Sequence, residues 1–569
     1  MKNLEVVKIF RDIAKILEIK GENVFRIRAY ERASQNIEGL PNALESFVKL
    51  DKLTKIPGIG KDLAERIKEY YRTGKIKIFE ELKKSIPEGL LDLLNIPSVG
   101  PKTAKLLYEK LKIKNISGLE KAIKKNKLKG IFGIKEKTIE NIIKGIEILK
   151  RGRERMTLAQ ATLIAEEFVG TLKDLAEVKK IAAAGSLRRQ KETVRDIDIL
   201  VVSDKPKKVM HALTEVPCVK NTQAEGETKA SVRTKEDVQV DCRVVEAKSF
   251  GAALLYFTGS KNFNIKIRQL AIRKGLKINE YGVFKADTFV CGTTEEEIFK
   301  ALSMAYIPPE LREDTGEIEL AKKFDLPKLI ELKDIKGDLH AHSTYSDGGN
   351  SIAEMASAAK ERGYSYIAIT DHSQSLKVAN GLTPQELKKK KLEIDTLNKK
   401  IKNFRILYGT EVDIDSDGNI DYDDDILKEF DIVVGAIHTG FKQSRQQLTK
   451  RTVRACKSKF VHIIAHPTGK LWGMREPYDL DFEEILKAAK DTNTCLEINA
   501  FPNRLDLNDL HCRQAKEARV KISIGTDSHE AIQLETMKFG IAVARRGWLE
   551  REDVINTLPI EALLKAIKK

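Results

Sequence analysis

After residue 338 the chain repeats one pattern, a short apolar run that ends in a histidine or an acidic residue. The runs are strand-like, and helical segments separate them. Strands that alternate with helices build a parallel sheet or a barrel, and residues at the carboxyl ends of its strands meet at one face. We therefore expect an α/β barrel over residues 336–569 with a chemical site at one end. Its marker segments are GDLHAHSTYSDG, YSYIAITDH, YGTEVD, FDIVVGAIH, HIIAHP, TCLEINA and KISIGTDSH.

The histidines of the chain are concentrated in this region, because only His211 among the nine precedes residue 340. A lone buried histidine is usually a hydrogen-bonded core residue. Several histidines at strand ends beside acids are better explained as metal ligands. The candidates are His340, His342, Asp347, Asp371, His372, Glu411, His438, His462, His466, Asp527 and His529.

Residues 336–569 resemble the polymerase-and-histidinol-phosphatase (PHP) domain, in which metal ions hydrolyse phosphate esters. The resemblance implies a set of nine ligands that hold up to three ions, and it leaves Asp371, His462 and His511 as supporting or structural residues. The implied groups are His340, His342, Glu411 and Asp527 for one ion, Glu411, His438 and His466 for a second, and Asp347, His372 and His529 for a third. Mixed histidine and carboxylate ligands fit Mn²⁺, Zn²⁺ or Fe²⁺.

The excess positive charge lies at the other end of the chain. Residues 1–150 contain 33 Lys and Arg against 20 Asp and Glu, an excess of 13 within a net charge of +17. Such an imbalance predicts a polyanionic partner. A solvated Lys/Glu surface of the thermophile type explains the charged fraction, but not its confinement to one end.

Three weak repeats lie in this basic region, at residues 55–67, 95–107 and 130–142. Each contains a glycine turn followed by a helix, which is the helix-hairpin-helix pattern that grips the DNA backbone through N–H groups. One such turn alone is more typical of a plain connector, but two clear copies and a looser third favour DNA binding. We expect helical domains over residues 1–88 and 89–150, with DNA contacts from Gly58, Gly60, Lys61, Gly100 and Lys102.

Three aspartates follow in a region of mixed strands and helices. Asp196 and Asp198 lie two apart on a predicted strand, so that both carboxylates share one face, and Asp241 lies on a second apolar strand. Three converging carboxylates can hold two Mg²⁺ ions for nucleotidyl transfer. Upstream, a predicted strand-to-helix corner offers phosphate-binding groups: Gly185, Ser186, Arg188 and Arg189.

Residues 1–317 resemble the family X DNA polymerases, and YFTGSKNFNIKIR (256–268) carries much of the likeness. The resemblance implies a palm over 151–250, a nucleotide-selecting subdomain over 251–317 and a linker over 318–335. It also implies nucleotide contacts from Tyr256, Phe257, Gly259 and Asn264, together with Gly185, Ser186 and Arg189. DNA contacts are implied for Arg268 and, in the lyase-like domain, for Arg26 and Tyr30.

The chain departs from the family pattern at three positions. Arg195 and Lys261 stand where animal relatives carry a glycine and an acid. Arg66 stands where the family's 5′-deoxyribose-phosphate lyase has its Schiff-base lysine, and a permanently protonated guanidinium cannot be that nucleophile. We therefore expect no efficient lyase activity. The surrounding Arg26, Tyr30, Arg32, Lys61 and Lys68 are left as a binding site for a 5′-phosphate.

Two charged segments carry no function of their own. DIDSDGNIDYDD (413–424) resembles an EF-hand loop, but its twelfth residue is Asp424 and a strand precedes it, so we interpret it as an acidic turn. The lysine-rich segment 382–403 is predicted to be a solvated helix. No apolar run approaches the ~20 residues of a membrane span. The six cysteines show no pairing pattern, and the N-terminus is no signal peptide, which predicts a cytoplasmic protein with reduced thiols.

Together these features predict a multidomain α+β protein: helix-hairpin-helix domains, a nucleotidyltransferase palm and a distorted PHP barrel. We expect a monomer that binds gapped or nicked double-stranded DNA and dNTPs and fills short gaps during repair with two Mg²⁺ ions. The barrel, with Mn²⁺ or Zn²⁺, would act as a 3′–5′ exonuclease or phosphoesterase and at abasic sites. Two alternatives stay open: a phosphatase of a small phosphate ester with a tethering front half, and a non-catalytic DNA-binding scaffold.

Overall fold

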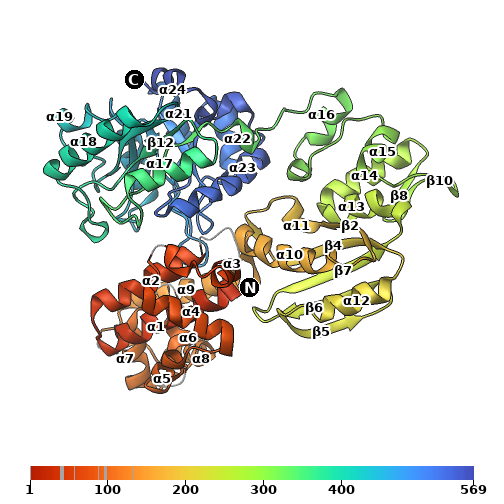
Figure 1. Cartoon of the computed structure of the whole chain (residues 1–569), viewed down its shortest axis with the longest axis horizontal. Helices are drawn as coiled ribbons and strands as arrows, with labels where there is room; N and C mark the ends of the chain where they lie inside the picture. Colours follow the sequence, from red (N-terminus) through yellow and green to blue (C-terminus); the bar gives the residue numbers. More distant parts are fainter. Residues whose placement is uncertain are drawn as a thin grey trace.

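A computed structural model describes residues 2–38, 44–56, 58–86, 89–94, 96, 99–131 and 133–569. Figure 1 shows a helical lobe at the lower left, a barrel domain above it, and the palm and thumb on the right. The helical lobe contains helices alone, whereas the palm, the thumb and the barrel domain each combine helices with a sheet, as the predicted fold class requires. In the described part of the chain, no helix combines the length and the apolar character that a bilayer crossing demands.

The first unit of the helical lobe contains α1 (Lys2–Lys20), α2 (Val24–Glu38), α3 (Leu44–Lys49), α4 (Lys61–Thr73) and α5 (Lys77–Lys84). Apolar residues at helical spacing along α1 fill its core, where Phe10 and Leu17 lie beside Ile37 and Ile67. The second unit contains α6 (Leu90–Leu94), α7 (Pro101–Leu111), α8 (Ile116–Lys124) and α9 (Glu136–Glu154), packed around a separate core.

Each predicted repeat places a glycine turn before a helix. Gly58 has a φ of 71° and Gly60 caps α4, Gly100 caps α7, and Gly133 with a φ of 94° precedes α9. Glycine adopts a positive φ at little cost, which explains its presence in these turns. Other residues of the repeats lie outside the described ones: Pro57, Asn95, Pro97, Ser98 and Phe132.

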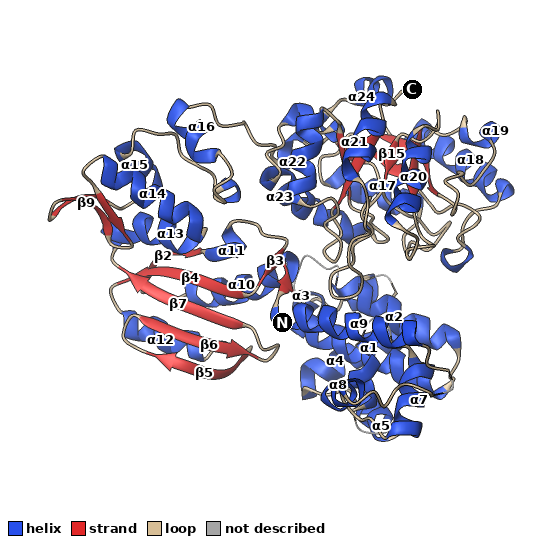
Figure 2. Ribbon diagram, turned by 180° about the vertical axis from the view of Figure 1, so that it is seen from behind, coloured by secondary structure: helices blue, strands red, loops and turns tan. Residues whose placement is uncertain are grey.

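The palm begins at the end of α9. Its elements are β1 (Met156–Thr157), α10 (Leu158–Lys173), β2 (Val178–Ala183), α11 (Gly185–Arg188), β3 (Thr193–Val194), β4 (Asp196–Ser203), α12 (Pro206–Thr214), β5 (Val219–Glu225), β6 (Lys229–Thr234) and β7 (Gln239–Val245). The main sheet has the order β2-β4-β7-β6-β5, in which β4 and β7 run parallel and their pairing sets Asp198 beside Asp241. Figure 2 shows this sheet with α10 and α12 packed on it.

The thumb follows the palm and extends beyond its predicted end. It contains α13 (Phe250–Thr258), α14 (Lys261–Arg273), β8 (Lys277–Asn279), β9 (Gly282–Lys285), β10 (Thr288–Cys291), α15 (Glu295–Ala301) and α16 (Glu317–Lys323). Phe263 and Phe299 lie at its core, and Trp548 from the barrel domain joins them. The thumb therefore shares part of its core with the barrel domain.

The segment 318–335, which we expected to be a linker, is a packed connection. Helix α16 occupies its first part, and Ile318 and Ala321 are buried in the thumb core. In its second part Ile330 is fully buried and its N–H donates to the carbonyl of Leu549 at 3.0 Å. The segment is rich in charged residues, so its few apolar positions were not recognised in the sequence. Because it is buried against the thumb in its first part and against the barrel domain in its second, it is a packed connection between the two.

A buried ion pair holds the thumb to the palm, and we expect Glu295→Gln to lower the free energy of unfolding by about 3 kcal/mol. Glu295 accepts hydrogen bonds from Arg188 at 2.6 Å and from the fully buried Arg312 at 2.5 Å. Burial raises the pKa of Glu295, but the hydrogen bond from Arg188 and the charge of Arg312 outweigh it and lower the pKa to about 2.

Because the pKa of the folded state lies below the ordinary 4.5, this stabilisation is complete above that pH and is lost as the pH falls toward 2. Urea denaturation at neutral pH and at about pH 3 measures the difference between Glu295→Gln and the wild type. The exposed neighbour variant Glu296→Gln is the matched control. An equal loss in both variants would contradict the assignment.

The barrel has seven parallel strands in sequential order, β11 (Gly337–Asp338), β12 (Tyr366–Ile369), β13 (Arg405–Asp413), β14 (Ile432–Ala436), β15 (Ile463–Ile464), β16 (Cys495–Asn499) and β17 (Ile522–Gly525). A parallel bridge between Ala341 and Ser528 joins the first and last strands and nearly closes the sheet. The surrounding helices are α17 (Ile352–Glu361), α18 (Pro384–Lys400), α19 (Asp424–Leu427), α20 (Arg445–Cys456), α21 (Phe482–Asp491), α22 (Asp509–Ala518), α23 (Met537–Arg546) and α24 (Ile560–Ala566).

Polar contacts hold the barrel domain to the rest of the chain. Asn36 of α2 donates to the buried Glu530 at 2.9 Å, and Arg32 lies 3.8 Å from the same carboxylate. Lys470 of the barrel domain pairs with Glu192 of the palm at 2.6 Å. The helical lobe and the palm therefore both dock on the barrel domain.

Two candidate metal centres

The three aspartates of the palm lie side by side on two strands. The parallel register pairs Asp198 of β4 with Asp241 of β7, and Asp196 lies two residues before Asp198 on the same face. Asp241 accepts hydrogen bonds from Ser231 and, at 2.9 Å, from Gln239. Among the described residues, the aspartate oxygens do not converge within 4.8 Å as those of the barrel ligands do.

Gly185 lies directly against Asp198. Its φ is +63°, and a Cβ at this position would meet Asp198 Oδ2 at 2.4 Å, so only glycine fits. Burial, together with the neighbouring charges of Asp196 and Asp241, raises the pKa of Asp198 to about 6. A buried carboxylate beside two further carboxylates forms a site that favours a divalent cation.

The two arginines after Ser186 face different partners. Arg188 is bound to Glu295, as described above, and to the hydroxyl of Thr258 at 2.7 Å. Arg189 donates to Glu313 at 3.0 Å and to the carbonyl of Thr258. The corner predicted from the sequence is present as the end of β2 followed by α11, which begins at Gly185.

The predicted nucleotide-contact residues of the thumb lie around the junction of α13 and α14. Tyr256 is 38% exposed, and its ring meets that of Phe257 edge-on at 5.1 Å. Gly259 ends α13 with a φ of 70°. Asn264 donates to the carbonyl of Tyr256 at 2.7 Å, and Arg268 lies one turn further along α14. Arg189 of the palm lies against the turn at Thr258 and Gly259 that joins these two helices.

The two departures from the family pattern in the palm and thumb are both accommodated. Arg195 pairs with Asp196 at 3.1 Å, so the extra cation faces the acid cluster. Lys261 is the first residue of α14, and the Ser260 side chain caps that helix. Neither substitution displaces the three aspartates from their strands.

In the lyase-like domain the structure corrects one expectation. Tyr30, which we placed at the DNA surface, is only 2% exposed because its ring packs edge-on against Phe10 in the core. Arg66 pairs with Asp62 through two nitrogens, at 2.9 and 3.1 Å. Arg26 lies 3.6 Å from Glu22. The helical period alone did not distinguish a core tyrosine from a surface one.

The glycine turns differ in what surrounds them. A Cβ on Gly58 would approach Asn36 to 3.0 Å, so this turn packs against α2, whereas nothing lies near a Cβ on Gly60 or Gly100. Lys61 is exposed at the start of α4, and the side chain of Lys102 lies outside the described ones. The first turn is therefore packed at Gly58 and open at Gly60, and the second is open at Gly100.

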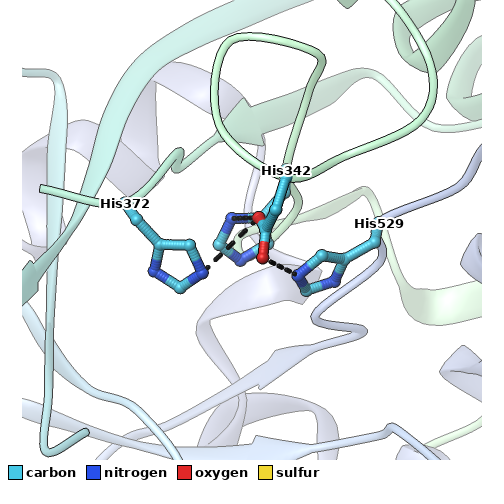
Figure 3. Close-up of side chains that lie close together, drawn as sticks. His342, His372 and His529 are labelled. Atoms are coloured by element: carbon cyan, nitrogen blue, oxygen red, sulfur yellow. Dashed lines mark ion pairs between the residues drawn. The ribbon is translucent and has the colours of Figure 1, made fainter. Parts of the chain in front are cut away.

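The second centre lies inside the barrel, where its nine predicted ligands follow the strand ends. His342, His372 and His529 converge on the carboxylate of Asp347 at 3.9, 3.6 and 3.3 Å (Figure 3). Their donor atoms, with one oxygen of Asp347, lie within 4.8 Å of one another. His340, His342 and Asp527 form a second such group, and His372, Glu411 and His438 a third.

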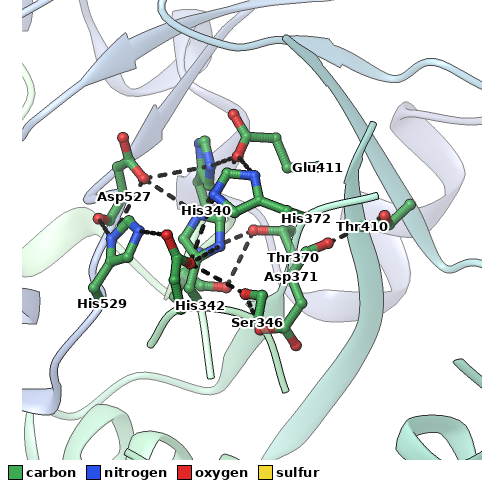
Figure 4. A network of polar contacts seen from close by, with 12 residues as sticks. His340, His342, Ser346, Thr370, Asp371, His372, Thr410, Glu411, Asp527 and His529 are labelled. Atoms are coloured by element: carbon green, nitrogen blue, oxygen red, sulfur yellow. Dashed lines mark hydrogen bonds and ion pairs between the residues drawn. The ribbon is translucent and has the colours of Figure 1, made fainter. Parts of the chain in front are cut away.

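Glu411 contacts more histidines than the other ligands described here, and Figure 4 shows it beside His340 and His372. One of its oxygens lies 3.3 Å from His438 and 3.1 Å from His466. The other lies 2.8 Å from His372, 3.5 Å from His340 and 3.6 Å from His342. The groups overlap those implied by the family resemblance, but His342 and His372 each join two of them.

Several of these buried atoms lack a hydrogen bond of acceptable geometry: Nε2 of His340, both ring nitrogens of His342, Nδ1 of His372 and Oε2 of Glu411. Buried polar atoms are normally satisfied, and an unsatisfied cluster is costly. Ligand atoms that converge in this way, and that make no hydrogen bond, fit divalent cations. The residues present therefore suit the metals that the barrel family requires.

Ionisation favours metal binding at the carboxylates and at two of the histidines, whereas at three others neighbouring carboxylates outweigh burial and raise the pKa, namely at His340, His438 and His529. Burial raises the pKa of Glu411, but the charges of His438 and His372 hold it well below its usual value. Burial lowers the pKa of His342 to about 4 and that of His466 to about 3, helped by neighbouring cations. Anionic carboxylates and neutral imidazoles are the forms that bind metal ions.

Sequence reasoning missed several residues that hold the ligands in place. Glu497 of β16 accepts from His340 Nδ1 at 2.6 Å and from the backbone N–H of His466 at 2.8 Å. Asp413 lies 3.3 Å from His438 Nδ1. Both acids lie near the ends of strands that the sequence marked, so their position was the available signal. Such partners orient imidazole ligands.

The three residues that we excluded from the ligand set serve the structure. The buried Asp371 pairs with the fully buried Lys390 at 2.9 Å and accepts hydrogen bonds from Ser343. His462 accepts from the backbone of Val433 at 2.9 Å. His511 packs its ring on Phe482.

In the acidic turn 413–424, Asp415 is occupied by hydrogen bonds within the turn.

Comparison with family models matches the helical lobe, the thumb and the barrel domain. The family models that match are a helix-hairpin-helix domain over residues 1–76, a SAM-like helix-hairpin-helix tandem over 90–147, the DNA polymerase beta thumb over 253–313 and the PHP domain over 338–501. They confirm the helical domains with their hairpins, the thumb and the barrel.

Among individual relatives, DNA polymerase/3′-5′ exonuclease PolX of Bacillus subtilis is 42% identical over 99% of this chain and 100% of its own length. A probable phosphatase of Thermoanaerobacter is 31% identical over 39% of this chain and 89% of its own length. Rat DNA polymerase lambda is 25% identical over 55% of this chain and 56% of its own. The chain belongs to the family X DNA polymerases that carry a C-terminal PHP domain.

Proposed function

We propose that the chain is a gap-filling DNA polymerase whose barrel removes 3′-terminal nucleotides. The register that sets Asp198 beside Asp241, against Gly185, carries the polymerase assignment. Two Mg²⁺ ions bound there would lower the pKa of the primer 3′-hydroxyl and neutralise the triphosphate. The surface from Tyr256 to Asn264 would orient the dNTP, and Arg189 would bind its phosphates.

The unpaired donors around Glu411 carry the nuclease assignment. Manganese or zinc held by the nine ligands, up to three ions, would polarise a phosphodiester for attack by water. Glu497 and Asp413 would orient the imidazoles, and the walls of the barrel would exclude bulk water from the ligands. The same centre would open the DNA backbone at an abasic site.

A groove between the helical lobe, the palm and the barrel domain supports DNA as the substrate. Its volume is ≈ 1780 Å³, and Gly100 of the second hairpin, Lys235 of the palm and Trp472 of the barrel domain line it. Further basic residues face it from the helical lobe: Lys8, Arg11, Lys15, Lys83, Lys84 and Lys114. The groove has seven basic lining residues against five acidic ones, and this excess of cations suits the phosphates of a gapped duplex bound by one copy of the chain. The acidic residues are Glu5, Asp12, Glu80, Asp92 and Glu236.

A 5′-labelled primer in a gapped duplex tests both activities in one assay. With dNTPs and Mg²⁺ the label should lengthen to fill the gap, and without dNTPs but with Mn²⁺ it should shorten from the 3′ end. No lengthening under any metal would refute the polymerase, and no shortening would refute the nuclease.

The phosphatase relatives favour one second candidate for the barrel, a phosphomonoesterase of a small ester. Release of phosphate from p-nitrophenyl phosphate, with no loss of nucleotides from DNA, would support it. The non-catalytic scaffold is tested by metal analysis, because a barrel that binds no transition metal when purified cannot hydrolyse through one.

Arg66 predicts that the lyase-like domain forms no Schiff base. With gapped DNA bearing a 5′-deoxyribose phosphate, borohydride should trap at least about tenfold less covalent adduct with the wild type than with Arg66→Lys. The variant keeps a cation beside Asp62 and restores a nucleophile. Arg72→Lys, on the exposed side of the same helix, is the matched control and should trap no more than the wild type. Strong trapping by the wild type would identify another lysine as the nucleophile.

A further inference from the structure

Helix α23 of the barrel domain ends at a buried arginine that reaches the polymerase half. Arg546 has a side chain 3% exposed. Its Nη1 donates to the carbonyl of Arg189 at 2.8 Å and to Glu313 Oε1 at 3.1 Å. Its other nitrogens donate to Asp509 of α22. One guanidinium thus connects the barrel domain with the palm and with the thumb.

Glu313 is shared between two arginines. The oxygen that accepts from Arg546 also accepts from Nε of Arg189 at 3.0 Å, and Lys191 lies 3.7 Å from it. The side chain of Arg189 is 13% exposed and lies over the turn at Thr258 and Gly259. The proposed phosphate-binding arginine is therefore oriented by a carboxylate that an arginine of the barrel domain also binds.

The charges of Arg189, Glu313 and Arg546 predict how the loss of Arg546 would change the binding of a triphosphate. A carboxylate paired with Arg189 alone would neutralise that arginine, whereas Arg546 withdraws part of the same negative charge. Arg546 also fixes the carbonyl of Arg189, where α11 ends and the Gly185–Ser186 corner is positioned. Loss of Arg546 would leave Glu313 to neutralise Arg189 more fully, and it would remove the hydrogen bond to the Arg189 carbonyl. Both changes would weaken the binding of a triphosphate by Arg189.

We propose that Arg546 is a positioning residue for the polymerase site, through which the barrel domain sets the affinity for the incoming nucleotide. The proposal rests on the proposed polymerase function. It assigns to the nuclease domain a second role that needs none of its metal ligands.

The test is steady-state filling of a one-nucleotide gap by the full-length chain. Arg546→Gln should raise the KM for dNTP about tenfold, the size expected for lost hydrogen bonds to a charged group, with kcat changed less than about twofold. Arg546→Lys keeps the positive charge but not the planar guanidinium with its several N–H donors. Its KM for dNTP should therefore lie between those of the wild type and Arg546→Gln. Exonuclease activity should be unchanged, which also reports that the barrel is folded.

Arg545→Gln is the matched control. Arg545 is the adjacent residue of α23 and also crosses to the thumb, but it binds Glu310 at 2.8 Å and the carbonyl of Ile330. This variant should leave the KM within twofold of the wild type. If both variants raise the KM equally, or if Arg546→Gln lowers kcat and exonuclease activity together, the role is only structural and the proposal fails.

A double-mutant cycle tests the path. If Arg546 acts through Glu313, the Arg546→Gln change should raise the KM much less in a Glu313→Gln background than in the wild type. Fully additive effects would overturn that path. A wild type that fills no gap would instead refute the polymerase function itself, so the two failures are distinguishable.

Discussion

Asp198→Asn is expected to lower the rate of gap filling by about three orders of magnitude or more and to leave exonuclease activity at the wild-type rate. Asp198 is the palm carboxylate that faces both Asp241 and Gly185. Its loss would remove a shared ligand of the proposed two-metal site, and several kcal/mol of stabilisation in the transition state correspond to this factor. Primer extension in Mg²⁺ measures the effect.

Asp204→Asn is the matched control, because Asp204 is an exposed acid just beyond the same strand that pairs with Lys179. It should extend primers at the wild-type rate. Gap filling that survives in Asp198→Asn would mean that the palm aspartates are not the catalytic centre. Since the pKa of Asp198 is about 6 before a metal binds, Mg²⁺ affinity should weaken as the pH falls through that value.

Glu411→Gln is expected to have the opposite selectivity: exonuclease activity falls by about three orders of magnitude, and gap filling is retained. Glu411 lies within 3.6 Å of five histidines, namely His340, His342, His372, His438 and His466. A neutral amide removes the charge that draws cations to the site. Elemental analysis of the purified variant should show less bound metal than the wild type.

Two further variants calibrate this result. Glu429→Gln changes an exposed acid that pairs with Lys391 on the outside of the barrel, and it should behave as the wild type. Glu497→Gln removes the partner of His340 and should cost about 10- to 100-fold, the usual effect of an orienting group. Wild-type nuclease activity in Glu411→Gln would refute the barrel as the hydrolytic site.

Much of both candidate sites was predictable because their residues follow local patterns. Asp196 and Asp198 share a strand face through the two-residue period, and the barrel residues follow apolar runs that are strands. Parallel pairing then brings strand ends together, which is why His340 and Asp527, far apart in sequence, lie within one group.

The features that the sequence did not predict depend on contacts between residues far apart in the chain, which no local pattern reveals. Tyr30 points into the core because its ring packs against Phe10. The spacing of residues in α2 did not show which face of the helix is buried. Arg546 is one arginine among many in the sequence, and only the docking of α23 on the palm distinguishes it from its neighbour Arg545. Glu497 supports a ligand on a different strand, a pairing set by closure of the barrel.

The packed segment between thumb and barrel has a kinetic consequence. Because α16 lies in the thumb core and Ile330 is buried at the barrel domain, we expect the two centres to keep a fixed separation, so that a primer terminus would change site only if the DNA itself moved. Extension and excision then compete for one terminus according to how often it unpairs. A mismatched end unpairs more readily than a matched one, so a rigid joint is sufficient to direct excision toward errors.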